Sequence, residues 1–368
     1  MKRFLLPLLL LSVAATASAQ LSGSGFYRVV NVADSRYVYV TDNTGSASAT
    51  SPDLKAVQLI TGLDNAISNP ATVLYFNNIS GTQYDIQAQG TSVKQIIGHT
   101  PNVYYSERSN AYQVYANSSG ATIYLGSDDD AYYQGKRISY MSISASGNYN
   151  LWNIYPISAD GSNYFGISPS VSVDGKYYQS FYADFAFSFA SSGMKAYYIS
   201  STSGDEATLV EITSSVIPAR TPVIIECSSS SASDNRLNLH TSGGSSVSGN
   251  ILKGVFFCNP YRPYSSAAVT KNDKTTMRVL GKTSTGKLGF VVCNDEELPA
   301  NQAYLTVSSS AGTEIAVKES GASSIDNITI EDKDQTGIFS ILGTRFDCSF
   351  EELPAGIYII DGKKVIKH

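Results

Sequence analysis

Residues 26–42 read FYRVVNVADSRYVYVTD, in which two Tyr- and Val-rich runs flank a short interval containing Asn, Ala, Asp and Ser. Short runs of β-branched and aromatic residues bounded by turn formers are typical of strands joined by turns. The pattern predicts an all-β fold, because it recurs along the chain, for example at residues 112–115, 122–125, 222–225 and 357–360. One exception is residues 51–63, whose apolar residues favour a short helix or an irregular loop.

The chain is weakly charged. Its 368 residues include 26 Lys or Arg and 31 Asp or Glu, which is 15%, against about 25% in average soluble domains. A net charge of −5 without a basic block argues against nucleic acid or an anionic membrane as the main partner. Only three His are present, which leaves little material for general-base catalysis or a His-rich metal site. The composition therefore favours a secreted binding or structural protein over an enzyme.

The first 19 residues have the organisation of a signal peptide. Lys2 and Arg3 precede the apolar residues 4–13, and a stretch of small residues ends in Ala-Ser-Ala at 17–19. The apolar run is shorter than the roughly 20 residues that a membrane-spanning helix needs. We expect cleavage before Gln20, and no later segment is long enough to be a transmembrane helix.

Residues 20–160 contain three loosely similar units. They open with Tyr-Arg-Val at 27–29, Tyr-Asp-Ile at 84–86 and Tyr-Gln-Val at 112–114, and the first and third continue after a turn with a second Tyr-containing run. Each unit is too small to bury its own apolar face. The threefold repetition therefore predicts one closed β-domain assembled from the three units.

Two of these units carry residues suited to binding sugar. Sugars stack an apolar face on an aromatic ring, while Asp, Asn or Gln hydrogen-bond their hydroxyls. The candidate ligand-binding residues are Tyr39, Asp42 and Asn43 in the first unit, and Tyr124 and Asp128 in the third. Asp128 opens a run of three Asp, for which a solvated turn, a ligand-facing acid and a metal site are the alternatives. The spacing does not match an EF-hand loop.

The opening Tyr27-Arg28-Val29 with Asn31, and the closing Trp-Asn-Ile-Tyr-Pro at 152–156, carry a resemblance. In these residues the block is similar to the ricin-type β-trefoil found in secreted proteins of Bacteroidetes bacteria. Asn150 stands where the Gln-x-Trp signature of these lectins would place Gln. The resemblance implies a β-trefoil-like, carbohydrate-binding domain in which Asp42 and Asp128 hold sugar hydroxyls. It also implies a protein secreted by, or held on the outer surface of, a Gram-negative bacterium.

Residues 161–320 continue the pattern of strands and turns. The order of the motifs at 182–189, 217–224 and 298–305 resembles a β-rich module of unassigned function in surface proteins of Bacteroidetes, and we expect a β-sandwich-like or barrel-like domain. Pro-Ala pairs precede several strand-like runs. Because Pro fixes φ and lacks an N–H, it suits the turn that leads into a strand.

Residues 321–368 form a third expected domain, a small β-unit with strand-like runs at 337–343 and 353–367. It is similar to the C-terminal domains of Bacteroidetes secreted proteins, including those sorted by the type IX system. The Pro-Asn-Pro opening of that sorting family is absent. A sorting domain and an ordinary terminal β-domain both remain open.

Chemically reactive groups are sparse. His240 lies beyond Cys227 on a strand-like run, but no third residue can be nominated to orient it. No metal site, cofactor fingerprint or catalytic motif is found. The widely spaced cysteines match no compact disulfide framework, and buried free thiols or one disulfide are the alternatives. They are Cys227, Cys258, Cys293 and Cys348.

Together these features lead to the hypothesis of a secreted or cell-surface, non-catalytic binding protein that recognises glycans or surface components through its N-terminal domain. The alternatives are a surface structural or adhesin subunit and a glycan hydrolase, which would need two facing carboxylates. We expect glycans or surface proteins as partners, with no cofactor and no nucleic acid.

Overall fold

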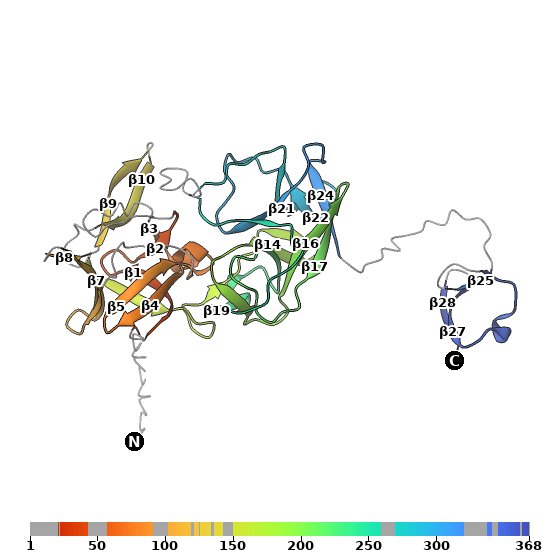
Figure 1. The fold of residues 1–368 in the computed structure, drawn as a ribbon, viewed down its shortest axis with the longest axis horizontal. Helices are drawn as coiled ribbons and strands as arrows, with labels where there is room; N and C mark the ends of the chain where they lie inside the picture. Colours follow the sequence, from red (N-terminus) through yellow and green to blue (C-terminus); the bar gives the residue numbers. More distant parts are fainter. Residues whose placement is uncertain are drawn as a thin grey trace, which may run out of the picture. The chain divides into compact units, whose positions relative to one another are not determined.

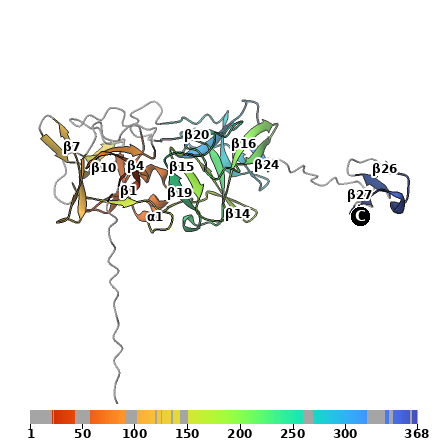
Figure 2. The same ribbon diagram turned by 60° about the horizontal axis from the view of Figure 1, so that its bottom comes forward.

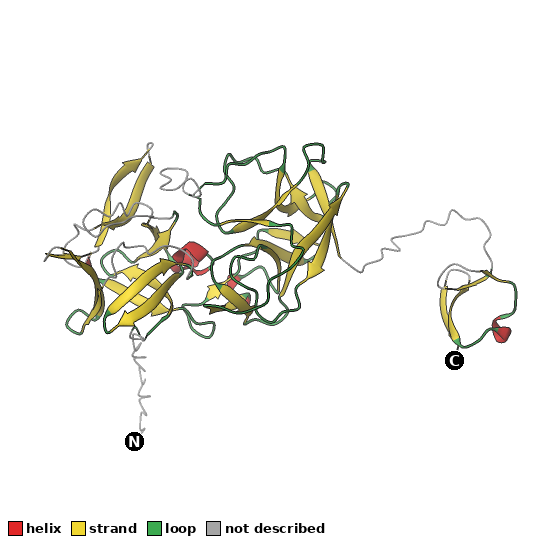
Figure 3. Ribbon diagram, viewed as in Figure 1, coloured by secondary structure: helices red, strands yellow, loops and turns green. Residues whose placement is uncertain are grey.

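The computed structural model describes residues 21, 23–42, 57–90, 102–118, 121–124, 126–133, 136–142, 150–258, 269–319, 337–340, 345–360 and 363–367. Strands predominate in these residues, and the helical elements are one short α-helix and short 3-10 turns (Figure 3). The predicted all-β fold class is confirmed. The chain forms two compact units, residues 1–319 and 320–368, and the boundary expected near residue 160 falls inside the first unit.

The first unit begins with an antiparallel arrangement of strands that we call the first region, residues 21–156 (Figure 1). Its elements are β1 (Gly25–Asn31), β2 (Arg36–Val40), β3 (Val57–Thr61), α1 (Leu63–Ile67), η2 (Pro70–Thr72), β4 (Leu74–Ser80), β5 (Gln83–Ala88), β6 (Asn102–Ser106), β7 (Ala111–Ser118), β8 (Ala121–Tyr124), β9 (Gly126–Tyr133), β10 (Lys136–Ser142) and β11 (Trp152–Pro156). β1, β4, β5, β6, β7 and β11 pair in a closed ring, because β11 hydrogen-bonds both β7 and β1. β2, β3, β10 and β9 extend in that order from β1, and β8 pairs with β7.

Alternating burial explains the closed ring of strands. In β5, Tyr84, Ile86 and Ala88 are buried and the residues between them are less buried, which is the period-two pattern of a strand with one face inside. These side chains belong to a cluster that includes Trp152 and Phe76, both fully buried. The β-trefoil assignment goes further than this pairing and stays a prediction.

One expectation for the first region is wrong. Residues 57–61 form neither a helix nor an irregular loop but the strand β3, which pairs with β2 from Arg36↔Thr61 to Val40↔Val57. α1 begins only at Leu63. A helix of a few residues is unstable by itself, whereas a neighbouring strand satisfies the backbone groups of β3. Residues 51–56 lie outside the described residues.

The remainder of the first unit, residues 157–319, is the second region and holds two sheets (Figures 1 and 2). Its elements are β12 (Phe165–Gly166), β13 (Val171–Val173), β14 (Lys176–Phe181), β15 (Ala186–Phe189), β16 (Lys195–Ser203), β17 (Glu206–Glu211), β18 (Val223–Cys227), η4 (Ala232–Asp234), β19 (Arg236–His240), β20 (Lys253–Val255), β21 (Met277–Lys282), β22 (Leu288–Val291), β23 (Gln302–Thr306) and β24 (Glu314–Glu319). β12, β19 and β15 form a small sheet, and the other strands form a sheet in the order β13-β14-β18-β16-β17-β24-β22-β21-β23-β20. The parallel pairing of β17 with β24 joins strands far apart in the sequence.

Two Pro-Ala turns lead into β18 and β23 and fix the side chain that follows each pair. Arg220 and Asn301, the residues after the two pairs, both have a φ of 59°, which is uncommon for residues other than glycine. The backbone N–H of Arg220 donates to the Ala183 carbonyl (2.8 Å), and that of Asn301 donates to the Val255 carbonyl (2.7 Å). Each turn therefore holds one polar side chain at a defined place.

The two regions share apolar core. Phe26 and Tyr75 of the first region belong to the same buried cluster as Phe165 and Phe185 of the second, and the rings of Phe26 and Phe185 lie 6.0 Å apart. In the other direction, Phe257 packs into the core of the first region. The regions are therefore joined by packing of the kind found inside a domain rather than by a linker alone.

Arg28 joins the two regions through a buried polar network. Its guanidinium donates to Thr72 Oγ1 and the Ile67 carbonyl in the first region (both 3.1 Å), and to Asn163 Oδ1 and the Tyr164 carbonyl in the second (both 2.7 Å). Arg28 is fully buried, and this burial lowers its pKa to about 10, so the guanidinium stays charged at neutral pH. A buried charge is costly unless it is hydrogen-bonded, so the network depends on all four partners.

The end of β5 also contacts the second region. Gln89 Oε1 accepts hydrogen bonds from the backbone N–H of Asp184 (3.2 Å) and from Asn301 Nδ2 (3.1 Å). A Cβ atom at Gly90 would lie 1.9 Å from the Asp184 carbonyl oxygen. Glycine is required at this position because the two backbones approach too closely for any side chain.

The second unit is a small antiparallel sheet in the order β26-β25-β27-β28. Its elements are β25 (Ile338–Ser340), β26 (Arg345–Phe346), η5 (Phe350–Glu352), β27 (Gly356–Ile360) and β28 (Lys363–Lys367). Among its described residues, the buried hydrophobic side chains are Leu353 and Tyr358. The rings of Phe346 and Phe350 lie 5.6 and 6.1 Å from the ring of Tyr358, so one tyrosine is the centre of this packing.

Candidate ligand-binding sites

Strand register brings two of the predicted ligand-binding residues into one row. Tyr39 of β2 lies opposite Gln58 of β3, which lies opposite Tyr140 of β10. Tyr140 lies opposite Asp128 of β9. Tyr39 and Asp128, from different repeats of the sequence, therefore belong to one row across four strands. The run of three Asp lies within β9, so the expectation of a turn at residues 128–130 is wrong.

The other predicted residues are placed separately. The Tyr39 hydroxyl donates to Gln58 Oε1 (2.5 Å), so it is already engaged within the protein. Asp42, just after β2, is fully buried, and a sugar would reach its carboxylate only after a rearrangement. Tyr124 ends β8, and Asn43 lies outside the described residues. Ligand binding by these residues stays a prediction.

A pocket of about 310 Å³ lies where the two regions meet. The first region contributes the connection between α1 and η2, and the second contributes β14, the residues just after β12 and the Pro-Ala turn before β23. The lining residues are uncharged: Ser68, Asn69, Pro70, Ile167, Ser168, Gln179, Phe181, Ala300, Asn301 and Gln302. A few placed polar groups among apolar walls are typical of small-molecule sites. We call this the junction pocket.

The junction pocket contains amide groups that are free to bind a ligand. Asn69 uses its Oδ1 to accept from the Ala71 N–H (3.0 Å), and Asn301 uses its Nδ2 to bond Gln89 and the Tyr182 carbonyl. Within the described residues, Asn69 Nδ2, Asn301 Oδ1 and the Gln302 amide have no hydrogen-bond partner. The pocket therefore offers both donors and acceptors without charge.

A second hollow, of about 400 Å³, contains two carboxylates, Asp205 and Glu314. Asp205 Oδ1 accepts from the Gly312 N–H (3.2 Å), and Glu314 accepts from the N–H (2.9 Å) and hydroxyl (2.7 Å) of Ser284. These bonds from Ser284 favour the charged carboxylate and lower the pKa of Glu314. A glycosidase needs one carboxylic acid with a raised pKa. Glu314 does not meet that requirement.

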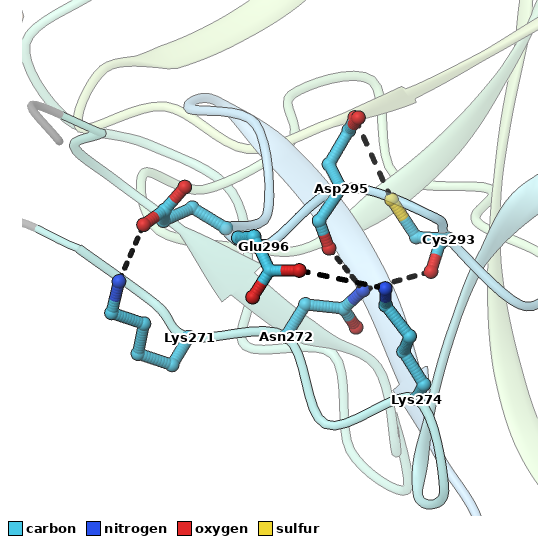
Figure 4. A network of polar contacts seen from close by, with 7 residues as sticks. Lys271, Asn272, Lys274, Cys293, Asp295 and Glu296 are labelled. Carbon is cyan, nitrogen blue, oxygen red and sulfur yellow. Dashed lines mark hydrogen bonds and ion pairs between the residues drawn. The ribbon is translucent and has the colours of Figure 1, made fainter.

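A polar network around Asn272 has a structural explanation (Figure 4). Asn272 Nδ2 donates to the carbonyls of Cys293 (2.9 Å) and Asp295 (2.8 Å), and Lys271 forms an ion pair with Glu297. These contacts tie the segment before β21 to the segment after β22. Exposed ion pairs of this kind contribute little free energy, and the amide of Asn272 makes the fixed connection.

One nucleophile and one base lie in contact. Ser188 Oγ of β15 and His240 Nε2 of β19 are 2.9 Å apart. Nucleophilic catalysis also needs a group that orients the base and donors for the oxyanion, and no acid bonds His240 in the described part of the chain.

Over the described residues, no group of three or more His, Cys, Asp or Glu is arranged to hold a metal ion. None of the described helices has the length and apolar character to cross a membrane.

All four cysteines are free, so the alternative of one disulfide does not apply. Cys227 is buried, Cys258 and Cys293 are partly buried, and Cys348 is exposed. Burial, with a smaller contribution from nearby Glu226, raises the pKa of the Cys227 thiol to about 12. Cys227 therefore acts as a small apolar residue of the core.

Comparison with known proteins gives no match: no family model, no curated protein and no solved structure corresponds to this chain.

Sequence reasoning missed the residues that build the junction between the regions. Arg28 lay within a motif that pointed to a strand, but nothing in the motif distinguished a buried guanidinium from an exposed one. No sequence motif around Gln89 indicated a contact with the second region. The Pro-Ala pairs marked the turns before Arg220 and Asn301, yet only the fold places Asn301 beside residues of the first region.

Proposed function

We propose that this chain is a non-catalytic binding protein, secreted or held at the cell surface, that recognises glycans. The observation that carries the proposal is the junction pocket, which combines uncharged amide and hydroxyl side chains with apolar walls. A sugar hydroxyl both donates and accepts hydrogen bonds, and so do side-chain amides. The weak overall charge of the chain and the resemblance of the first region to ricin-type lectins support the same proposal.

The alternative of a glycan hydrolase has less support. The carboxylates that share a hollow, Asp205 and Glu314, do not line the junction pocket, and the lowered pKa of Glu314 does not suit a general acid. The other alternative is a surface structural or adhesin subunit. No feature of the described residues favours it over glycan binding.

The test is a glycan array with the purified full-length chain, covering neutral plant and mucin sugars. Ser168 is exposed and lines the pocket, so Ser168→Trp should obstruct it and reduce binding at least about tenfold. Ser170→Trp, at a nearby exposed position outside the lining, is the matched control. Gln302→Ala should weaken binding about fivefold, the effect of one net hydrogen bond, and Gln83→Ala, at an exposed amide on β5, should not.

Failure to bind any glycan above background would remove the proposal. Full binding by folded Ser168→Trp would place the ligand elsewhere, and the row from Tyr39 to Asp128 would be the next region to mutate.

A further inference from the structure

Two kinds of hydrogen-bond donor beside the first Pro-Ala turn lack partners in the part of the chain that is described. Arg220 uses Nε to bond the Asp184 carboxylate, but its two terminal nitrogens have no partner there, and its side chain is 47% exposed. The Tyr182 hydroxyl likewise has no partner among those residues. Unused donors of this kind are available to a ligand.

The guanidinium of Arg220 is held in place by the buried carboxylate of Asp184. Asp184 is wholly inaccessible, with 0% of its side chain exposed, and a buried carboxylate is stable only when it is paired or hydrogen-bonded. The left-handed backbone of Arg220 fixes the start of its side chain, and the guanidinium carbon lies 5.8 Å from the centre of the Phe256 ring. Nε is engaged by Asp184, and the 47% exposure of the side chain leaves the guanidinium partly accessible to solvent.

Tyr182 is fixed by contacts on its ring. A Cβ atom at Gly254 would lie 2.2 Å from that ring, so the tyrosine packs directly on a glycine, and its ring meets Phe256 edge-on at 6.2 Å. Burial raises the pKa of Tyr182, with Arg220 acting in the opposite direction. The hydroxyl is therefore protonated at neutral pH and able to donate.

We infer that Arg220 and Tyr182 form a subsite for an oxyanion carried by an acidic sugar, either a carboxylate or a sulfate group. A guanidinium presents parallel N–H groups that match two oxygens of such an anion, and the tyrosine hydroxyl supplies a further donor. The inference rests on the proposed glycan binding and extends it from neutral to acidic sugars. Asp184 offsets part of the charge of Arg220, so recognition depends on directed hydrogen bonds more than on net charge.

The test measures binding of glucuronate, glucose 6-sulfate and glucose to the full-length chain by titration calorimetry or ligand-observed NMR. At least one of the two anions should bind about tenfold more tightly than glucose, the effect of hydrogen bonds to a charged group. The two anions distinguish a carboxylate from a sulfate preference. Tyr182→Phe keeps the ring and its packing, and should reduce anion binding about fivefold while leaving glucose binding and the thermal midpoint unchanged.

Arg220→Lys keeps a positive charge beside Asp184 but loses the paired N–H groups, so it should reduce anion binding about tenfold. Arg345→Lys, on the second unit, is the matched control and should have no effect. If the anions bind no more tightly than glucose, or if folded Tyr182→Phe and Arg220→Lys keep the full preference, the inference is overturned. Neutral glycans bound on the array would still support the proposed function in that case.

Discussion

The two compact units of the chain bury their apolar residues to very different extents. The described residues of the first unit form three hydrophobic clusters, and they also include buried polar residues such as Arg28 and Asp184. In the described part of the second unit, Ile357 and Ile366 lie opposite each other on β27 and β28 and remain 39% and 54% exposed. A short chain segment cannot enclose much surface. Packing between distant strands therefore holds the first unit together, whereas the second unit consists of one four-stranded sheet with little buried apolar surface among its described residues.

Thiol labelling should give the largest difference between the units. Cys227 is buried in the first unit, with a pKa raised to about 12, whereas Cys348 is exposed in the second. Labelling of Cys227 requires unfolding, which is populated at about one part in a thousand or less. In the native protein, we therefore expect Cys348 to react with iodoacetamide at least about a thousandfold faster, as measured by peptide mass spectrometry. Equal rates would show that Cys227 is accessible to the reagent in the native protein and would contradict the difference between the units.

Arg28→Ala should strongly destabilise the first unit. It leaves four hydrogen-bonding partners without the guanidinium and empties a buried volume, which should cost about 3 kcal/mol in the free energy of unfolding. The fluorescence of Trp152, the single Trp of the chain, follows denaturant unfolding of the first unit, and far-ultraviolet circular dichroism follows the strands of both units. Arg345→Ala removes an exposed ion pair with Asp347 (3.4 Å) in the second unit and should change stability by less than about 1 kcal/mol. Similar losses from both variants would contradict the comparison.

Gly90→Ala should disrupt the contact between the end of β5 and the Asp184 backbone, which joins the two regions of the first unit. The new Cβ would collide with the Asp184 backbone, and relief of such a clash typically costs about 2 kcal/mol. Gly161→Ala is the matched control, because its nearest neighbour would be 3.6 Å from the new Cβ. The thermal midpoint of the first unit should fall for Gly90→Ala and stay constant for Gly161→Ala. A tolerated Gly90→Ala would mean that this approach of the regions is looser than the structure has it.

Glu314→Gln should have the smallest effect, and one that depends on pH. Bonds from Ser284 lower the pKa of Glu314 below its ordinary 4.5. A carboxylate whose pKa is lower in the folded state contributes stability above the ordinary value and loses it as pH falls through the folded value. The urea midpoints of wild type and Glu314→Gln should therefore differ slightly at about pH 7, and the difference should shrink as the pH falls below the ordinary pKa of 4.5. A constant difference would show that Glu314 acts through packing.

Much of the secondary structure could be predicted from local patterns. The runs around Tyr27 and Tyr39 became β1 and β2, and the Gly-Ile-Tyr run became β27, because period-two burial and turn residues act over a few positions. β3 was missed. Its short apolar run fits a helix or a strand equally well, and the choice was made by pairing with β2.

The candidate sites were far less predictable. Tyr39 and Asp128 were chosen as members of separate repeats, and only strand register placed them in one row. The junction pocket joins Asn69 to Asn301, and neither residue belongs to a local motif for binding. The Pro-Ala motif predicted a turn before Arg220. It did not indicate that the Arg220 side chain pairs with the buried Asp184.

By itself, the sequence determined the all-β class, the turns at the Pro-Ala pairs and the uncharged polar character of the chain, since these follow from residue types and short spacings. Tertiary structure decided how the first and second regions join. It buried Arg28 among four partners, brought Gln89 against Asn301, and left the outer nitrogens of Arg220 unpaired within the described residues. Those outcomes depend on contacts between residues that are far apart in the sequence. Such contacts form only when the strands pack, so local sequence patterns do not reveal them.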